Sequence, residues 1–163
     1  MKTLHDLFEN QLKDLYSAET QLLTALPALL EKANDKRLQQ AFENHFEQTK
    51  QQKSRIETIC RELNIAPSGV TCKAMEGLIK ETEHFIEGVK DDELMDVGLI
   101  AGAQRIEHYE ISGYGTAVRF AKELGHRDIA KILQETLDEE YDADNALDKL
   151  AENRMNKKAI GSA

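Results

Sequence analysis

The chain has 163 residues, of which 31% are charged and two are proline, and it contains no tryptophan. A chain of this length fits one domain with its own hydrophobic core. Its net charge of −9 argues against a nucleic-acid partner or an anionic membrane partner, because neither would attract so acidic a surface. No apolar run is long enough to span a bilayer and the N-terminus lacks the apolar core of a signal peptide, so we expect a cytoplasmic protein.

Long segments with apolar residues at every third or fourth position predict an all-α fold. We expect four long helices and one shorter helix, over residues 3–32, 36–63, 73–88, 93–124 and 127–152. The corner at Ala33-Asn34 is so short that the first two helices must be antiparallel neighbours, and Gly125 is the natural end of the third long helix. The sequence therefore predicts a ferritin-like antiparallel four-helix bundle of two helical hairpins, with the short helix in the crossover. Residues 1–152 would form this domain, and residues 153–163 a polar tail that we expect to fray.

The third long helix carries four glycines: Gly98, Gly102, Gly113 and Gly115. Glycine lowers helix propensity, and its lack of a side chain permits close contact between helices. We expect this helix to pack closely against a neighbour, which could belong to a second subunit.

Acidic side chains interrupt the apolar faces of the long helices. Glu107 and Glu110 share one face of the third long helix with Ala103 and Tyr114, because residues three and four apart lie on the same side. Counting outward from the two corners places polar residues of the other helices at the same level. One layer is therefore predicted from six side chains: Glu19, His45, Glu107, Glu110, Glu140 and Asp144.

Five carboxylates in a dry interior must be protonated, paired with a cation or bound to metal. No Lys or Arg lies on these faces, whereas two divalent cations would cancel four of the charges. Oxygen-rich ligation with a single imidazole suits iron or manganese better than zinc or copper. We therefore expect a dinuclear iron centre, with manganese as an alternative, whose ligands are the six residues of the layer. Tyr16 and Tyr114 lie one turn from the acids and could donate hydrogen bonds to them.

Each of these residues also has a plainer explanation. Glu19 taken alone would be expected to curve out to solvent, and His45 could be a satisfied core histidine. Asp144 could instead bond a neighbouring helix, and His108, one residue off the acidic face, is expected to pack at a helix or subunit boundary. Three further acids of the last helix are expected to form a solvated face: Glu139, Asp142 and Asp148.

Five segments, spread over nearly the whole chain apart from the tail, carry a resemblance to a known family. They are Leu15-Tyr-Ser-Ala-Glu19, Ala41-Phe-Glu-Asn-His45-Phe-Glu-Gln-Thr49, Cys72-Lys-Ala-Met-Glu-Gly-Leu-Ile79, Ile106-Glu-His-Tyr-Glu-Ile-Ser-Gly-Tyr-Gly115 and Leu137-Asp-Glu-Glu-Tyr-Asp-Ala-Asp144. In order and spacing they closely resemble the YciF/YciE family of bacterial stress-response proteins. The resemblance implies a ferritin-like bundle with an extra short helix, a homodimer and a cytoplasmic role under general or osmotic stress. It also implies kinship with rubrerythrins and a di-iron site.

The chain departs from the rubrerythrin-like pattern, in which the second and fourth helices each carry a Glu-x-x-His pair. Its second helix has Glu47-x-x-Lys50, and its fourth has Glu139-x-x-Asp142 or Glu140-x-x-x-Asp144, so neither expected place holds an imidazole. The second helix also supplies Gln48 and Gln52 where acids would be wanted. The sequence therefore predicts an asymmetric site, held more tightly by the third and fourth long helices, which weakens the case for fast oxygen chemistry.

Two functions fit these observations. The first is a stress-response protein with a dinuclear metal site that handles peroxide, oxygen or iron. The second is a metal-free structural or interaction protein in which the acidic layer is a relic, kept partly protonated. Nothing in the sequence specifies a large ferritin-type cage, and the absence of a nucleophile–base pair or phosphate-binding glycine loop leaves hydrolases and kinases without support. Whether the protein is an enzyme stays open.

Overall fold

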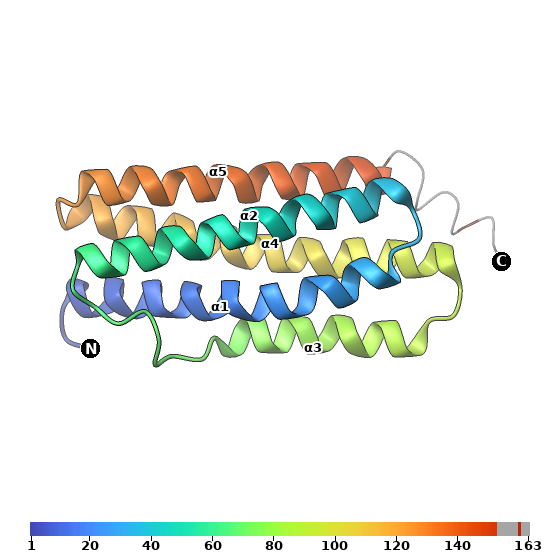
Figure 1. Cartoon of the computed structure of the whole chain (residues 1–163), viewed down its shortest axis with the longest axis horizontal. Helices are drawn as coiled ribbons and strands as arrows, with labels where there is room; N and C mark the ends of the chain where they lie inside the picture. Colours follow the sequence, from blue (N-terminus) through green and yellow to red (C-terminus); the bar gives the residue numbers. More distant parts are fainter. Residues whose placement is uncertain (153–159, 161–163) are drawn as a thin grey trace.

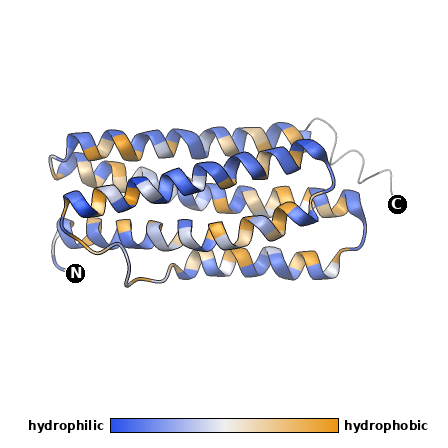
Figure 2. Ribbon diagram, in the orientation of Figure 1, coloured by the Kyte–Doolittle hydropathy of each residue, from blue (hydrophilic) through white to orange (hydrophobic). Residues whose placement is uncertain are grey.

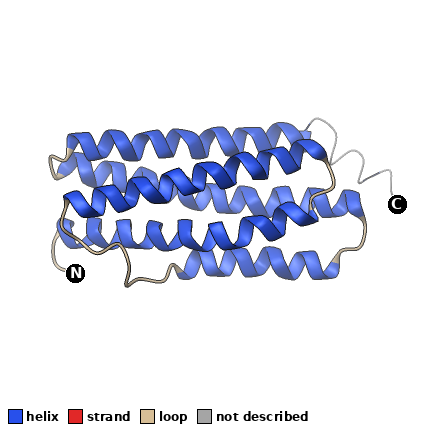
Figure 3. Ribbon diagram, viewed as in Figure 1, coloured by secondary structure: helices blue, strands red, loops and turns tan. Residues whose placement is uncertain are grey.

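The computed structural model describes residues 1–152 and 160, and this part of the chain is built from helices without a strand (Figure 3). The helices are α1 (Leu4–Lys32), α2 (Lys36–Glu62), α3 (Lys73–Gly88), α4 (Asp92–Glu123) and α5 (Arg127–Leu150). The predicted all-α fold is confirmed, and each helix lies close to its predicted range. Most of the predicted tail, residues 153–159 and 161–163, falls outside the described residues. Within the described part, no helix combines the length and apolarity needed to cross a bilayer.

The four long helices form the bundle. α1 packs against α2 and α4, and α5 packs against α4 and α2, so each long helix packs against two other long helices (Figure 1). Neighbouring helices run in opposite directions, as predicted for two hairpins. α3 carries the chain back along the bundle from the end of α2 to the start of α4, and it packs on α4 and α1. The short helix therefore joins the two hairpins.

Polar residues at the corners define where the helices begin and end. The side chain of Asp35 caps α2 by accepting a hydrogen bond from the backbone N–H of Arg37, at 2.8 Å. The buried carboxylate of Asp96 in α4 accepts from the backbone N–H groups of Asn34, at 2.7 Å, and Asp35, at 2.9 Å. Gly125 has a φ of 81°, the left-handed conformation that commonly ends a helix, just after α4. Asp96 thereby ties the corner of the first hairpin to the second hairpin.

The hydrophobic core consists of two separate apolar clusters. One lies towards the α1–α2 corner and includes Leu22, Phe42 and Leu99, whereas the other lies towards the α4–α5 corner and includes Leu12 and Ile56. Figure 2 shows apolar positions recurring between hydrophilic ones along the helices. Between them along the helices lie buried polar residues: Glu19, His45, Thr49, Gln52, Glu107, Glu110 and Glu140. We call these seven residues the polar layer.

Three of the four glycines of α4 serve contacts within the chain. A Cβ atom at Gly98 would overlap the ring of Phe85 in α3, and one at Gly102 would lie 2.6 Å from Oγ1 of Thr82 in the same helix. A Cβ at Gly113 would lie 2.8 Å from a side-chain carbon of α1. The close approach expected from the sequence is thus observed between helices of the same chain.

We expect Gly102→Ala to destabilise the fold. Thr82 is buried and β-branched, so it cannot move aside, and overpacking of this kind costs about 1–3 kcal/mol. Gly77→Ala in α3 is the matched control, because no atom lies within 4 Å of the added methyl group there and alanine is the better helix former by about 1 kcal/mol. Denaturant unfolding should show the two variants shifting in opposite directions, and equal stabilisation of both would contradict the close contact.

Candidate metal centre

All four long helices contribute to the polar layer. One ligand atom from each of His45, Glu107, Glu110 and Glu140 lies within 4.8 Å of the other three. All four side chains are buried, with exposed fractions of 6% or less. Ligand atoms of one divalent ion stand about 2.0–2.2 Å from it and therefore at most about 4.4 Å from each other. The four atoms are close enough together to be considered ligands of one ion, although they would have to draw closer to surround it.

The polar layer contains many buried atoms that lack a hydrogen-bond partner among the described residues. They are both ring nitrogens of His45, both carboxyl oxygens of Glu110, and Oε2 of Glu19, Glu107 and Glu140, together with Oε1 of Gln52. Native proteins satisfy most buried polar atoms, because an unsatisfied one costs more than a hydrogen bond contributes. His45 Nε2 lies 3.5 Å from Glu107 Oε1, so even this pair is too long for a good hydrogen bond. A bound cation would satisfy these atoms, and the donor set therefore fits a metal.

Burial determines the protonation of the layer when no metal is bound. It raises the pKa of Glu19, Glu107 and Glu110 well above the ordinary value, and neighbouring carboxyls raise it further. Burial also raises the pKa of Glu140 to about 7, although hydrogen bonds to its carboxylate limit the rise. The pKa of His45 is lowered to about 4 by burial, so its imidazole is neutral near pH 7 and offers a lone pair to a metal.

Hydrogen bonds hold two of the acids in place. The hydroxyl of Tyr114 donates to Glu19, as predicted for a residue that supports the ligands. The amide of Gln52 donates to Glu140 Oε1, at 2.5 Å. The corresponding prediction for Tyr16 was wrong, because its hydroxyl donates to Glu57, at 3.2 Å.

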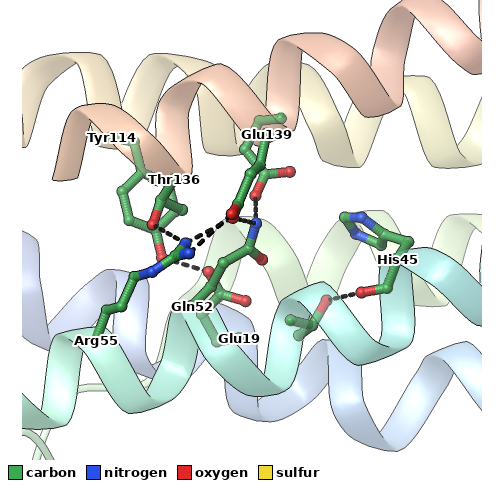
Figure 4. A network of polar contacts seen from close by, with 9 residues as sticks. Glu19, His45, Gln52, Arg55, Tyr114, Thr136 and Glu139 are labelled. Atoms are coloured by element: carbon green, nitrogen blue, oxygen red, sulfur yellow. Dashed lines mark hydrogen bonds and ion pairs between the residues drawn. The ribbon is translucent and has the colours of Figure 1, made fainter. Parts of the chain in front are cut away.

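An ion pair between α2 and α5, which we did not predict from the sequence, lies at one side of the polar layer. Arg55 donates two hydrogen bonds to the carboxylate of Glu139, at 2.6 and 2.8 Å, and a third to Thr136, at 3.1 Å (Figure 4). Gln52 also donates to Glu139, at 3.1 Å, which connects this ion pair to Glu140. The prediction that Glu139 belongs to a solvated face was wrong, since its side chain is only 24% exposed and paired. The signal in the sequence was the spacing of Gln52 and Arg55, three residues apart on α2.

The structure does not bring Asp144 into the group of four. Its carboxylate accepts a hydrogen bond from Gln104 in α4, at 3.2 Å, and lies 3.2 Å from Nε2 of His108 in the same helix. This is the alternative in which Asp144 bonds a neighbouring helix. His108 contacts α5 through this pair, but its side chain is 68% exposed and is not packed between helices of the described chain. Of the six predicted ligands, the structure thus buries five in the layer and leaves Asp144 at its periphery.

An antiparallel four-helix bundle with inward-facing carboxylates and a histidine at its centre is the architecture of ferritin-like bundle proteins. Comparison with known proteins defines the family more narrowly. Residues 3–160 match a family described as a domain of unknown function, DUF892. Protein YciF of Escherichia coli (strain K12) is 46% identical over 164 residues, covering 100% of this chain and 99% of the relative. The chain belongs to this family, and the resemblance found in its five motifs is confirmed.

Solved structures agree with this assignment. The crystal structure of the E. coli stress protein YciF matches with a TM-score of 0.92 and 46% identity, over 96% of this chain and 99% of that one. YcfI of Rhodopseudomonas palustris, described as a candidate structural protein, matches with a TM-score of 0.88 and 40% identity, over 91% and 94%. A protein from Xanthomonas campestris pv. campestris, at 20% identity and a TM-score of 0.73 over 97% and 94%, shares the fold.

In the presence of a chelator, we expect stability to fall as the pH rises above about 6.5 and passes about 7, the value to which burial raises the pKa of Glu140. A carboxyl whose pKa is raised in the folded state holds more protons there than in the unfolded chain, so the free energy of unfolding decreases with pH until that pKa is passed. Each such carboxyl contributes a slope of up to about 1.4 kcal/mol per pH unit. His45 has the opposite sign, but its effect is confined to the interval between about 4 and 6.5.

Denaturant unfolding at several pH values measures this slope. Glu110→Gln removes one titrating carboxyl at nearly constant volume and should give a shallower slope than the unmodified protein. Glu47→Gln on the exposed side of α2 is the matched control and should leave the slope unchanged. If Glu110→Gln and the unmodified protein had the same slope, the carboxyl of Glu110 would not be held protonated by the fold.

Proposed function

We propose that this protein binds iron or manganese in the polar layer and acts in a bacterial stress response, handling iron, peroxide or oxygen. The observation that carries the proposal is the convergence of ligand atoms from His45, Glu107, Glu110 and Glu140, each with an atom that lacks a hydrogen-bond partner in the described structure. Carboxylate oxygens with one imidazole are the donors that these two metals accept. Kinship with a protein described as a stress protein supports the physiological role.

The residues of the layer divide the proposed binding between two positions. His45, Glu107, Glu110 and Glu140 would hold the first ion. A second ion, proposed from the sequence, would use Glu19 together with Glu110 and Glu140. The charges of these three carboxyls interact: Glu140 raises the pKa of Glu19, and Glu19 raises the pKa of Glu110. The first position has the fuller ligand set, which supports an asymmetric centre. Bound metal would supply Lewis-acid chemistry, and iron would add redox chemistry.

The neighbouring side chains would orient the ligands. Tyr114 would hold one oxygen of Glu19 and leave the other free, and Gln52 would do the same for Glu140. Such hydrogen bonds fix the direction of a ligating carboxylate and tune its affinity for the ion. The Arg55–Glu139 pair would in turn fix the position of Gln52.

Metal analysis tests the proposal. Protein loaded with ferrous ion without oxygen should retain about one to two ions per chain in an elemental assay. Loaded protein should melt at a higher temperature, because a ligand present at about 100 times its dissociation constant stabilises the folded state by about 2.7 kcal/mol. Glu110→Ala should lose most of this gain, whereas Glu47→Ala, which removes an exposed acid of α2, should keep it. No more than a trace of metal after loading would exclude the proposal.

A metal-free structural role is the second candidate. It is favoured by the bonds that Gln52, Tyr114 and Arg55 already make within the layer, and by the description of the Rhodopseudomonas relative. In this case the carboxyls would remain protonated at neutral pH, and neither chelator nor added metal would change the melting temperature. The melting experiment therefore separates the two candidates.

We also propose that the protein is a cytoplasmic homodimer, which rests on the family resemblance. Two large apolar residues on the bundle surface, Leu94 at 46% exposure and Tyr141 at 49%, are candidates for the subunit contact. Light scattering should give a mass near twice 18.4 kDa. A mass near 18.4 kDa would exclude the dimer, and a mass many times larger would indicate a ferritin-type cage instead.

A further inference from the structure

A cavity of about 170 Å³ lies between α2 and α5 and reaches α4. Its wall is formed by Ala41, Phe42, Asn44, His45 and Gln48 of α2, Glu107 of α4, and Asp142, Ala143, Ala146 and Leu147 of α5. Asn44, Asp142 and Ala146 are exposed, so the cavity opens to solvent on their side. The buried lining residues form its inner wall: Phe42, His45, Glu107 and Leu147.

Two residues of the candidate metal centre, His45 and Glu107, belong to this inner wall. Both ring nitrogens of His45 and Oε2 of Glu107 lack hydrogen-bond partners within the described structure. The other two members of the group, Glu110 and Glu140, have no exposed surface and do not line the cavity, so they lie deeper. The three unpartnered atoms of His45 and Glu107 have almost no surface open to solvent, so the cavity reaches the side chains of this outer pair while their ligand atoms lie just behind its wall.

The chemistry of the wall favours a cation over an anion. Asn44, Gln48 and Asp142 offer oxygen atoms to an ion that passes, and no Lys or Arg is among the lining residues. The chain as a whole carries a net charge of −9, which raises the local concentration of cations and lowers that of anions. Small side chains at Ala143 and Ala146 keep the passage open at α5.

We infer that this cavity is the route by which a divalent cation loads into the centre, with Asp142 at its mouth and His45 with Glu107 as the first ligands met. The inference rests on the proposed function, since it requires that the polar layer binds metal. It specifies the order in which the ligands are met. Ions enter between α2 and α5, meet His45 and Glu107 first, and then reach Glu110 and Glu140.

Loading kinetics with cobalt(II) alone, followed by the absorption of the bound ion in a stopped-flow instrument, test this route. Ala146→Trp places a large ring at the mouth and should slow loading by about tenfold or more, because ions must then wait for local opening of the bundle. The final amount of bound cobalt and the dissociation constant should not change. Asp142→Asn should slow loading by about two- to threefold at low ionic strength, and added salt should remove the difference.

Two matched controls lie on the same helix. Asn145→Trp adds the same ring at an exposed position of α5 that does not line the cavity, and Asp148→Asn removes the same charge at another exposed position. Both should load at the rate of the unmodified protein. If Ala146→Trp does not fold, Asn44→Trp narrows the mouth from α2 instead.

The outcomes distinguish this inference from the proposed function. Normal loading rates in variants with a blocked mouth, with cobalt bound at the end, would overturn the route and leave the metal centre in place. Equal slowing by Ala146→Trp and Asn145→Trp would also overturn it, because the ring would then act through something other than the cavity. Failure of the unmodified protein to bind cobalt, iron or manganese would overturn the centre itself.

Discussion

The burial of several carboxyl groups away from water is the constraint on which the rest of the structure depends. Four carboxyl groups from three helices are buried at one level of the bundle, and each must be protonated, hydrogen-bonded or bound to a cation. The chain meets this demand only in part: Tyr114 donates to Glu19 and Gln52 donates to Glu140, whereas Glu110 receives no hydrogen bond from the described residues. Replacing buried ionisable groups with apolar residues of similar volume is often neutral or stabilising, so stability alone does not account for these acids.

One side of the polar layer is filled by hydrogen-bonded side chains, which we call the closed edge, and the other borders a cavity, which we call the open edge. Residues of α2 line both edges. At the closed edge, Gln52 and Arg55 fill the space between α2 and α5 with an amide and an ion pair to Glu139. At the open edge, two turns earlier on the same helix, His45 borders a cavity that reaches solvent. The other three long helices, α1, α4 and α5, each contribute at least one acid to the layer. This division explains why the arrangement is asymmetric although the two hairpins are similar in length.

The helices and most of the layer could be predicted because periodic apolar residues define helix faces, and short corners determine which residues of a hairpin lie at the same level. That counting places Glu19, His45, Glu107, Glu110 and Glu140 correctly inside the bundle. It fails for Asp144, because level along a helix does not determine direction around it, and polar groups of α4 draw this side chain to the periphery. It also misses Arg55, whose long side chain reaches Glu139 from a position beside the apolar face.

The separation of the core into two apolar clusters has a consequence for how the sequence can vary. Because the clusters form distinct contact groups on either side of the polar layer, we expect the effects of substitutions in one cluster on stability to add to those of substitutions in the other. Each end of the bundle can therefore be repacked by substitution without changing the side-chain contacts of the other. Neither cluster alone determines how the four helices are aligned along the bundle axis. That alignment depends on both clusters, because the acids between them must stay at the same level.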